Sequence, residues 1–513
     1  STGEAYYGGE LGVGVFKSID HGVTWNLLPS TTAVTRSSKI LCDFQGNVYL
    51  ASNGITGGGG LLRSVNGGTS WTDITPTGLS NRICDLEITS TTGPARLHVV
   101  TGISSAMGYR FTDNPATVTS GTWTTPTTNF TTGALKRAEI AVSGNTLFAL
   151  PVDANDEVPT IYKSVDGGDN WAPTAAQPGG GGWASGQGWY ALAAAINPAD
   201  ANQCIVGGLD NYKTTDGGAS WALISVWAGS SGNYVHADQH TSIWYDNGNK
   251  FLFGSDGGIF YSANGGITAV NKNVGLRLKE FYSCAIHPTL TNYFLAGAQD
   301  NGTHQFNGAG LTSSIEVTGG DGAYVDIDQD QPQYQFGAYI YNQYRRSTNG
   351  GTSWSSVNFS NSAGEFINPF DYDDLGNRMY CCYTAGQYLR WENPQTGNTN
   401  TAVSMPLFNG GFAEAITVSP YTANRVYFGT SNGRVIKVDN AEAATPTAVN
   451  ITGAGMTGGA FVNCINTGSS DQNLVACFSN YGITNIWVSA DGGTTWTGQD
   501  GTLPNIPVYW AVF

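Results

Sequence analysis

The chain has 513 residues, with 70 glycines, 12% charged residues and 12% aromatic residues. This composition is typical of short strands joined by tight turns, because helices favour Ala, Glu, Lys and Leu. The net charge of −16 repels nucleic-acid phosphates and anionic lipids, so we expect no nucleic-acid partner. The sequence contains no apolar run of about 18 residues, which predicts no insertion into a membrane.

The start of the chain and its cysteines give further expectations. The chain begins with Ser1 and has no signal-peptide pattern, so we expect a processed mature form or a fragment. Its eight cysteines have no CxxC or Cys/His metal spacing, and most lie in apolar, strand-like runs. We interpret them as small buried hydrophobic residues, and leave open one or two disulfides.

One eight-residue pattern returns along the chain. It consists of Ser/Thr, any residue, Asp/Asn, Gly/His, Gly, any residue, Ser/Thr/Asn and Trp. The copies cover residues 18–25, 64–71, 164–171, 214–221, 347–354 and 489–496, and residues 262–268 form a copy without the Trp. The Asp or Asn can accept backbone hydrogen bonds, the glycines permit positive φ, and the Trp buries a large ring. The pattern predicts a hairpin with a fixed turn, repeated along an array.

These copies resemble the Asp-box, or BNR repeat, of sialidase-like β-propellers. Consecutive copies start 46 to 50 residues apart in places, which is the length of a four-stranded blade. The longer gaps then contain degenerate units, as in 281–317, where four short runs predict a sheet without a good box. We therefore predict an all-β propeller of about eleven four-stranded blades.

Eleven blades exceed the usual four to eight in a ring. We predict two fused rings, with one very large ring as the alternative. The first portion covers 1–240 (blades 1–5) and the second 241–513 (blades 6–11). The end segments 4–9 and 508–513 are predicted to be strands that complete one blade between them, unless the chain is a fragment.

A second resemblance suggests chemistry. Residues 188–198 and 254–260 resemble segments of two-propeller, xyloglucanase-type endo-glucanases, and the resemblance implies that Asp256 is the general acid. Residues 8–14 match the family's other carboxylate motif and put Glu10 in the place of the base. This chain departs from the family motif in that Glu10 stands where the family has Asp and Val13 interrupts the motif's Gly-Gly pair. Its array of blades is also shorter than the family's. The alternative interpretation makes Asp256 a turn residue, because Asp-Gly-Gly is the usual turn of this chain.

The same resemblance requires aromatic platforms for sugar rings. Trp183, Trp189, Tyr190 and Trp227 are the candidates for substrate binding, with core or loop packing as the alternative. An inverting hydrolase needs one protonated and one ionised carboxyl about 6.5–9.5 Å apart.

Polar residues near strand ends form a further group of candidates. His236, Asp238 and His240 alternate, so they can share one strand face. A metal site there is geometrically conceivable, but we favour a polar channel lining and predict no metal or other cofactor. Asp300 and Asp321 follow strand ends, where they either line a channel mouth or cap turns. The segments around these residues resemble secreted Bacteroidetes proteins of the same superfamily, often labelled glycosyl hydrolases.

Two related families set the limits of the functional hypothesis. Sialidases share the repeated eight-residue pattern, but the Arg-Ile-Pro motif of that family is absent from this sequence, which disfavours sialidase activity. The ten-bladed sortilin receptors bind proteins and carry a cysteine-rich module that is also absent. We expect an extracellular or cell-surface protein that engages a polysaccharide, as an inverting endo-glycoside hydrolase or as a non-catalytic adhesion or binding propeller. A cell-surface protein is the alternative partner.

Overall fold

The structure is a computed structural model. It describes residues 12–53, 59–89, 95–103, 105–131, 133, 135–228, 233–245, 248–276, 279–308, 313–503 and 506–513. Contacts divide the chain into two compact units, Ser1–Leu278 and Lys279–Phe513. Residues 239–271 thus lie in the first unit, whereas the predicted boundary between the two portions follows residue 240. Among the described residues, no helix is both long and apolar enough to cross a membrane.

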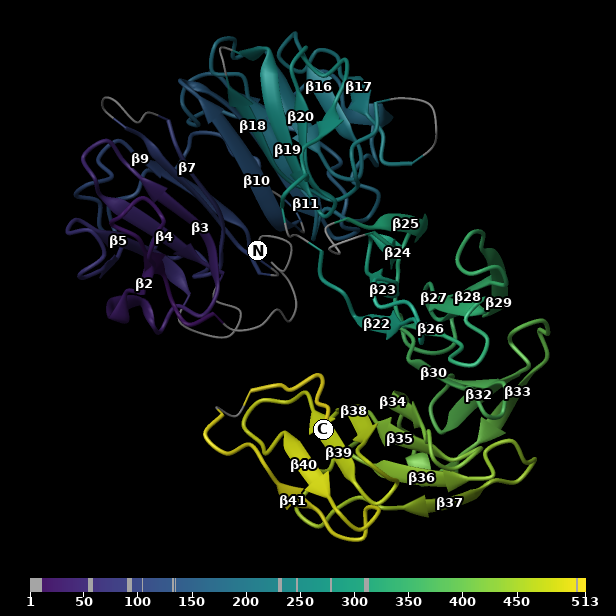
Figure 1. Cartoon of the computed structure of the whole chain (residues 1–513). Coiled ribbons are helices and arrows are strands. Elements are labelled where there is room, and N and C mark those ends of the chain that lie inside the picture. Colours follow the sequence, from purple (N-terminus) through teal and green to yellow (C-terminus); the bar gives the residue numbers. More distant parts are fainter. Residues whose placement is uncertain are drawn as a thin grey trace. The chain divides into compact units, whose positions relative to one another are not determined.

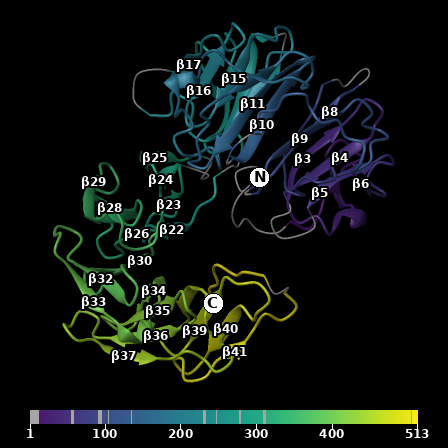
Figure 2. The same cartoon turned by 180° about the vertical axis from the view of Figure 1, so that it is seen from behind.

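The described residues of the first unit form six antiparallel sheets, in which strands pair in chain order. Figure 1 and, from behind, Figure 2 show them. The first three sheets are β1(Phe16–Lys17) and β2(Asn26–Leu27); β3(Ser37–Cys42), β4(Val48–Ser52), β5(Gly60–Ser64) and β6(Thr72–Asp73); and β7(Ile83–Ile88), β8(Leu97–Thr101) and β9(Gly108–Thr112). The other three are β10(Leu135–Ser143), β11(Thr146–Asp153), β12(Tyr162–Ser164) and β13(Ala172–Pro173); β14(Ala193–Ile196), β15(Cys204–Gly207), β16(Asn211–Thr214) and β17(Ala222–Ser225); and β18(Gln239–Tyr245), β19(Lys250–Ser255), β20(Gly258–Ser262) and β21(Val270–Asn271).

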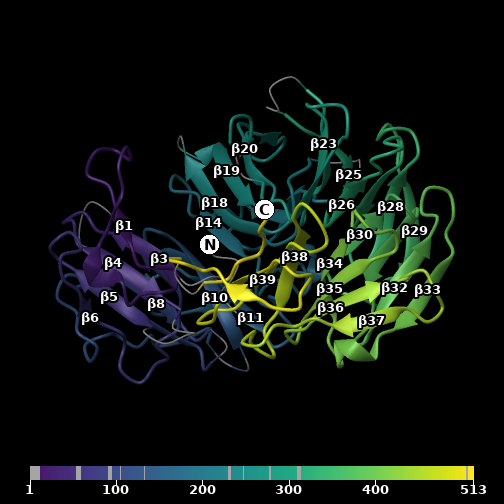
Figure 3. The ribbon, with the colours of Figure 1, turned by 60° about the horizontal axis from the view of Figure 1, so that its bottom comes forward.

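In the part of the second unit that the structure describes, the strands form five four-stranded antiparallel sheets, which follow one another in Figure 3. They are β22(Ser283–Ile286), β23(Phe294–Ala298), β24(Gly302–Phe306) and β25(Ile315–Thr318); β26(Val325–Ile327), β27(Gln335–Ala338), β28(Asn342–Ser347) and β29(Ser355–Ser360); β30(Phe370–Asp373), β31(Arg378–Cys382), β32(Gln387–Glu392) and β33(Asn400–Ser404); β34(Ala413–Val418), β35(Val426–Thr430), β36(Val435–Asp439) and β37(Thr447–Asn450); and β38(Val462–Thr467), β39(Leu474–Phe478), β40(Ile486–Ser489) and β41(Thr497–Gly498). Short 3-10 turns occur at Pro29–Thr31, Pro178–Gly180 and Pro406–Phe408.

In both units, neighbouring sheets contact one another through their first strands; in the second unit these contacts join β22 to β26, β30 to β34 and β34 to β38. In the first unit β3 contacts β7, β7 contacts β10, β10 contacts β14 and β14 contacts β18. Apolar side chains from neighbouring sheets fill the space between them, as where Phe148 and Leu150 pack with Ile196 and Val206. This arrangement is that of β-propeller blades, so the prediction of an all-β propeller is confirmed.

The repeated pattern forms the predicted turn. In the last copy, Asp491 Oδ1 accepts hydrogen bonds from Ser489 Oγ (2.8 Å) and Thr495 N (2.8 Å). Gly493 has a φ of 88°, which a side chain would strain, and its N–H donates to Ser489 Oγ (2.9 Å). The Trp496 indole N–H donates to Ile451 O in the preceding sheet (2.7 Å). This copy therefore fixes its own turn and links it to the preceding blade, whereas the indoles of Trp171 and Trp354 donate within their own copies.

The two predicted end strands, 4–9 and 508–513, are not observed among the described residues as a pair that completes one blade. Residues 4–9 lie outside the described residues. Residues 508–513 form no strand, although Val508 N donates to Phe478 O (3.0 Å) and Ala511 O accepts from Asn466 Nδ2 (3.4 Å). This segment packs beside β38 and β39 of the second unit.

Candidate functional site

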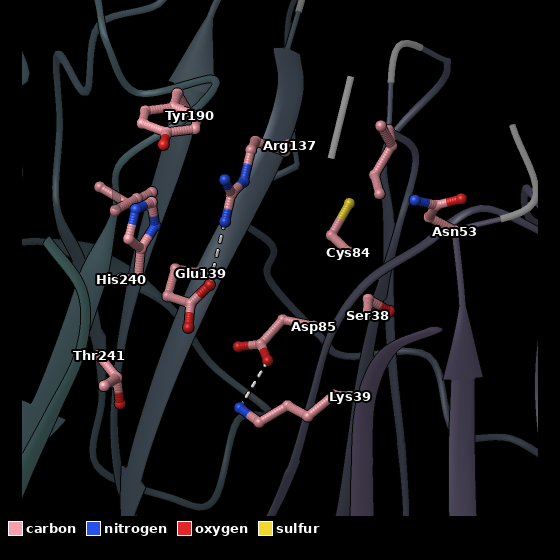
Figure 4. A pocket seen from close by; sticks show the side chains of 12 residues that line it. Ser38, Lys39, Asn53, Cys84, Asp85, Arg137, Glu139, Tyr190, His240 and Thr241 are labelled. Atoms are coloured by element: carbon pink, nitrogen blue, oxygen red, sulfur yellow. Dashed lines mark hydrogen bonds and ion pairs between the residues drawn. The ribbon is translucent and has the colours of Figure 1, made fainter. Parts of the chain in front are cut away.

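A pocket of about 380 Å³ lies among the first strands of the first unit (Figure 4). The lining comes mainly from β3, β7, β10 and β18 and from the segment just before β14, which the blade packing brings together. Lys39 pairs with Asp85 and Arg137 pairs with Glu139 along the walls of the pocket. It is lined by Ser38, Lys39, Asn53, Cys84, Asp85, Ile103, Arg137, Glu139, Tyr190, Leu192, His240 and Thr241.

Asp85 fixes one wall of the pocket. Its Oδ1 accepts from Lys39 Nζ (2.7 Å) and from Leu86 N (2.8 Å), and its Oδ2 accepts from Ile140 N (2.8 Å). Burial lowers the pKa of Lys39, but the negative charges of Asp85 and Glu87 outweigh this effect and raise it above its ordinary value. Asp85 thus joins β3, β7 and β10, and its carboxylate is held by one cation and two amides.

Glu139 forms the opposite wall, on β10. Its Oε2 accepts from Arg137 Nη2 (3.3 Å), while Arg137 Nη1 donates to Trp189 O (3.2 Å). Burial raises the pKa of Glu139 to about 8, and the charge of Asp85 adds to this effect. Glu139 is therefore mostly protonated at neutral pH and can donate a proton or a hydrogen bond.

Asp256 lies in the turn between β19 and β20, next to the pocket residues Tyr190 and His240. Its Oδ2 accepts from Tyr190 OH (2.7 Å) and its Oδ1 from His240 Nε2 (2.6 Å). The Tyr190 and His240 rings meet edge to face, with centroids 5.0 Å apart. One carboxylate therefore orients both a phenol and an imidazole at the pocket. Three residues singled out from the sequence come together here, although their mutual contact was not predicted.

His236 lies next to the same turn. A Cβ on Gly257 would stand 2.2 Å from its ring, so only glycine fits beside it. The predicted alternation of His236, Asp238 and His240 is interrupted, because Asp238 has a φ of 62° and β18 begins only at Gln239. Within the described ranges, no three His, Cys, Asp or Glu side chains are grouped so as to hold a metal ion.

The predicted tryptophans have different environments. Trp183 is only 4% exposed and packs against Tyr212, so its face is not open to a ligand. Trp227 is 46% exposed, and its backbone N–H donates to Asp210 Oδ1 (2.9 Å). Trp189 is half-buried, with its ring centroid 5.4 Å from that of Tyr190. Trp189 is thus the tryptophan that borders the Asp256 cluster.

Asp300 and Asp321 belong to the second unit, where Asp300 N donates to Asp321 Oδ1 (3.1 Å). Glu10 lies outside the described residues, so its position relative to Asp256 is still a prediction.

Sequence reasoning missed Lys39, Asp85, Arg137 and Glu139. A signal was present, because Asp85 and Glu87 alternate with apolar residues on β7, and Arg137 and Glu139 lie two residues apart on β10. Charged residues that alternate with apolar ones indicate that one face of a strand is polar, here the face of β7 and β10 that lines the pocket.

Comparisons give similarities of fold. No protein-family profile matches the chain, and no protein of curated function matches its sequence. A GH74 enzyme of Niastella koreensis is 16% identical, with a TM-score of 0.41 over 95% of this chain and 89% of that one. The GH74 xyloglucanase of Xanthomonas campestris is 15% identical (TM-score 0.33; 94% and 74% covered). PorZ, a surface component of the type-IX secretion system of Porphyromonas gingivalis, is 13% identical (TM-score 0.40; 94% and 72% covered). Similarities at this level assign no activity to the chain.

Proposed function

We propose that this protein is an extracellular or cell-surface propeller that binds a glycan at the pocket of the first unit. The observation that carries the proposal is the Asp256 carboxylate, which holds Tyr190 and His240 in fixed orientations at the pocket. Polar groups that are oriented before binding lose little conformational entropy when a ligand arrives. Trp189 borders them and offers an apolar surface.

The charges of the pocket also favour a ligand rich in neutral hydroxyl groups. Lys39 and Arg137 supply donors, Asp85 supplies an acceptor, and protonated Glu139 can serve as either. A hydroxyl group both donates and accepts, so a sugar can use this mixture without bringing an uncompensated charge into the pocket.

Binding to immobilised or soluble polysaccharides tests this proposal. We expect Tyr190→Phe to weaken glycan binding about tenfold, because it removes the hydroxyl through which Asp256 orients this ring; about 1.4 kcal/mol corresponds to tenfold in affinity. Tyr421→Phe is the matched control, since Tyr421 donates to Gly468 O in the second unit. Equal affinities of both variants and the wild type would refute the assignment of the site.

Hydrolysis is a second candidate function, favoured by the pKa of Glu139. Carboxyl groups whose environments separate their pKa values provide an acid and a base for catalysis. Burial raises the pKa of Glu139 to about 8, whereas both oxygens of Asp256 accept hydrogen bonds, from Tyr190 OH and His240 Nε2. We therefore favour Glu139 over Asp256 as the proton donor; the pairing of Asp256 with Glu10 is the alternative inferred from the sequence.

Release of reducing ends from polysaccharides separates binding from hydrolysis. If Glu139 is the acid, Glu139→Gln should abolish the release of reducing ends and leave glycan binding intact. If only Asp256→Asn loses this release, Asp256 is the acid, as the sequence motif implies. Binding without release in the wild type would rule out the hydrolase for the glycans tested.

A further inference from the structure

Two cysteines face each other in the last sheet of the second unit. β38 and β39 pair antiparallel, with Cys464 directly opposite Cys477. Opposed residues of antiparallel strands have Cα atoms about 4.5–5.5 Å apart, inside the range of about 4.4–6.8 Å that a disulfide spans. The strand register thus places the two residues for a covalent bond.

We propose that Cys464 and Cys477 form a cross-strand disulfide when the protein folds in an oxidising environment. The two Sγ atoms become bonded and each thiol loses its hydrogen. The two protons and two electrons pass to a thiol–disulfide oxidant such as oxidised glutathione, which is reduced to two thiols. Extracellular compartments favour this reaction, but the bond does not depend on the proposed glycan site.

The strand register singles out this pair among the eight cysteines. The other cysteines have no cysteine opposite them: Cys42 faces Val48, Cys204 faces Ile196, Cys284 faces Ala296, Cys381 faces Phe370, Cys382 faces Tyr388, and Cys84 lies in the bulge between Ile83 and Asp85. Cys381 and Cys382 are neighbours on β31, and successive side chains of a strand point to opposite faces.

The surroundings of the pair would protect the bond. Cys464 is 1% exposed and Cys477 is fully buried. Val508 and Ala511 pack against them, and Ala511 O accepts a hydrogen bond from Cys464 Sγ (3.6 Å). A reductant must therefore displace the segment 506–513 before it reaches the sulfur atoms, so we expect slow reduction of the folded protein.

Peptide mapping of the full chain tests the proposal. The protein is folded with oxidised and reduced glutathione, denatured without reductant, alkylated and digested. We expect six alkylated cysteines and one linked peptide pair that contains Cys464 and Cys477, and eight alkylated cysteines after reduction. Eight alkylated cysteines without reduction, or a link through any other cysteine, would overturn the proposal.

Matched variants sharpen the result. Cys204→Ser, which removes a buried cysteine of the first unit, should keep the linked peptides. Cys464→Ser should lose them and leave every remaining cysteine open to alkylation. If Cys464→Ser does not fold, the wild-type map alone decides.

Discussion

Replacing Glu139 by Gln tests the electrostatics of the pocket, because Gln imitates the protonated carboxyl. Burial raises the pKa of Glu139 from 4.5 to about 8. The folded state therefore holds a proton that the unfolded state releases between these two values. The stability contributed by this group is complete below pH 4.5 and is lost as the pH rises towards 8.

The expected size follows from these values. At about 1.4 kcal/mol for each pH unit, wild type should lose about 4 kcal/mol between pH 5 and pH 9 relative to Glu139→Gln. Urea unfolding over this pH range, with hydrogen exchange of β10 peptides to identify the first unit, measures the difference. Asp113→Asn, which removes a carboxylate that is 60% exposed, is the control and should show no such trend. A difference between wild type and Glu139→Gln that stays constant with pH would refute the reasoning.

Three further changes test the packing and the site. Trp391→Ala should destabilise the second unit by about 3–5 kcal/mol, because Trp391 is fully buried; a loss below about 1 kcal/mol in urea unfolding would contradict this. Asp471→Asn should cost several kcal/mol and flatten the acid limb of the stability curve. Burial raises the pKa of Asp471, but its hydrogen bonds, first among them the one with Ser419, lower it below its ordinary value. The stability that Asp471 contributes is therefore present above about pH 4 and is lost as the pH falls. An acid limb that is the same in Asp471→Asn and wild type would contradict this. Gly257→Ala should weaken glycan binding, because the added Cβ displaces the His236 ring. The control Gly458→Ala, whose Cβ meets nothing within 4 Å, should bind the glycan normally. Equal glycan binding by the two variants would argue against the site.

The fold was predictable because its signals are local. The box residues fix a turn through contacts within eight residues, and the intervals between boxes give the blade length. Even a unit without a good box was predictable, since the four runs predicted within 281–317 correspond to the four strands β22 to β25. Short apolar runs between glycines and asparagines suffice for this.

The site was only partly predictable because it depends on long-range packing. Asp256 was identified through a motif, and Tyr190 and His240 through residue type. Their contact requires three segments 16 to 66 residues apart to meet, which no local pattern encodes. The charged wall of Asp85 and Glu139 arises in the same way, because Asp85 reaches the backbone of Ile140 in the next blade.

The most direct test of the proposed function is a crystal structure of the protein with the oligosaccharide that it binds best. We predict a sugar within hydrogen-bonding distance of Tyr190 or His240, in the pocket of the first unit and beside Trp189. A sugar bound elsewhere, with this pocket filled only by water, would contradict the proposal.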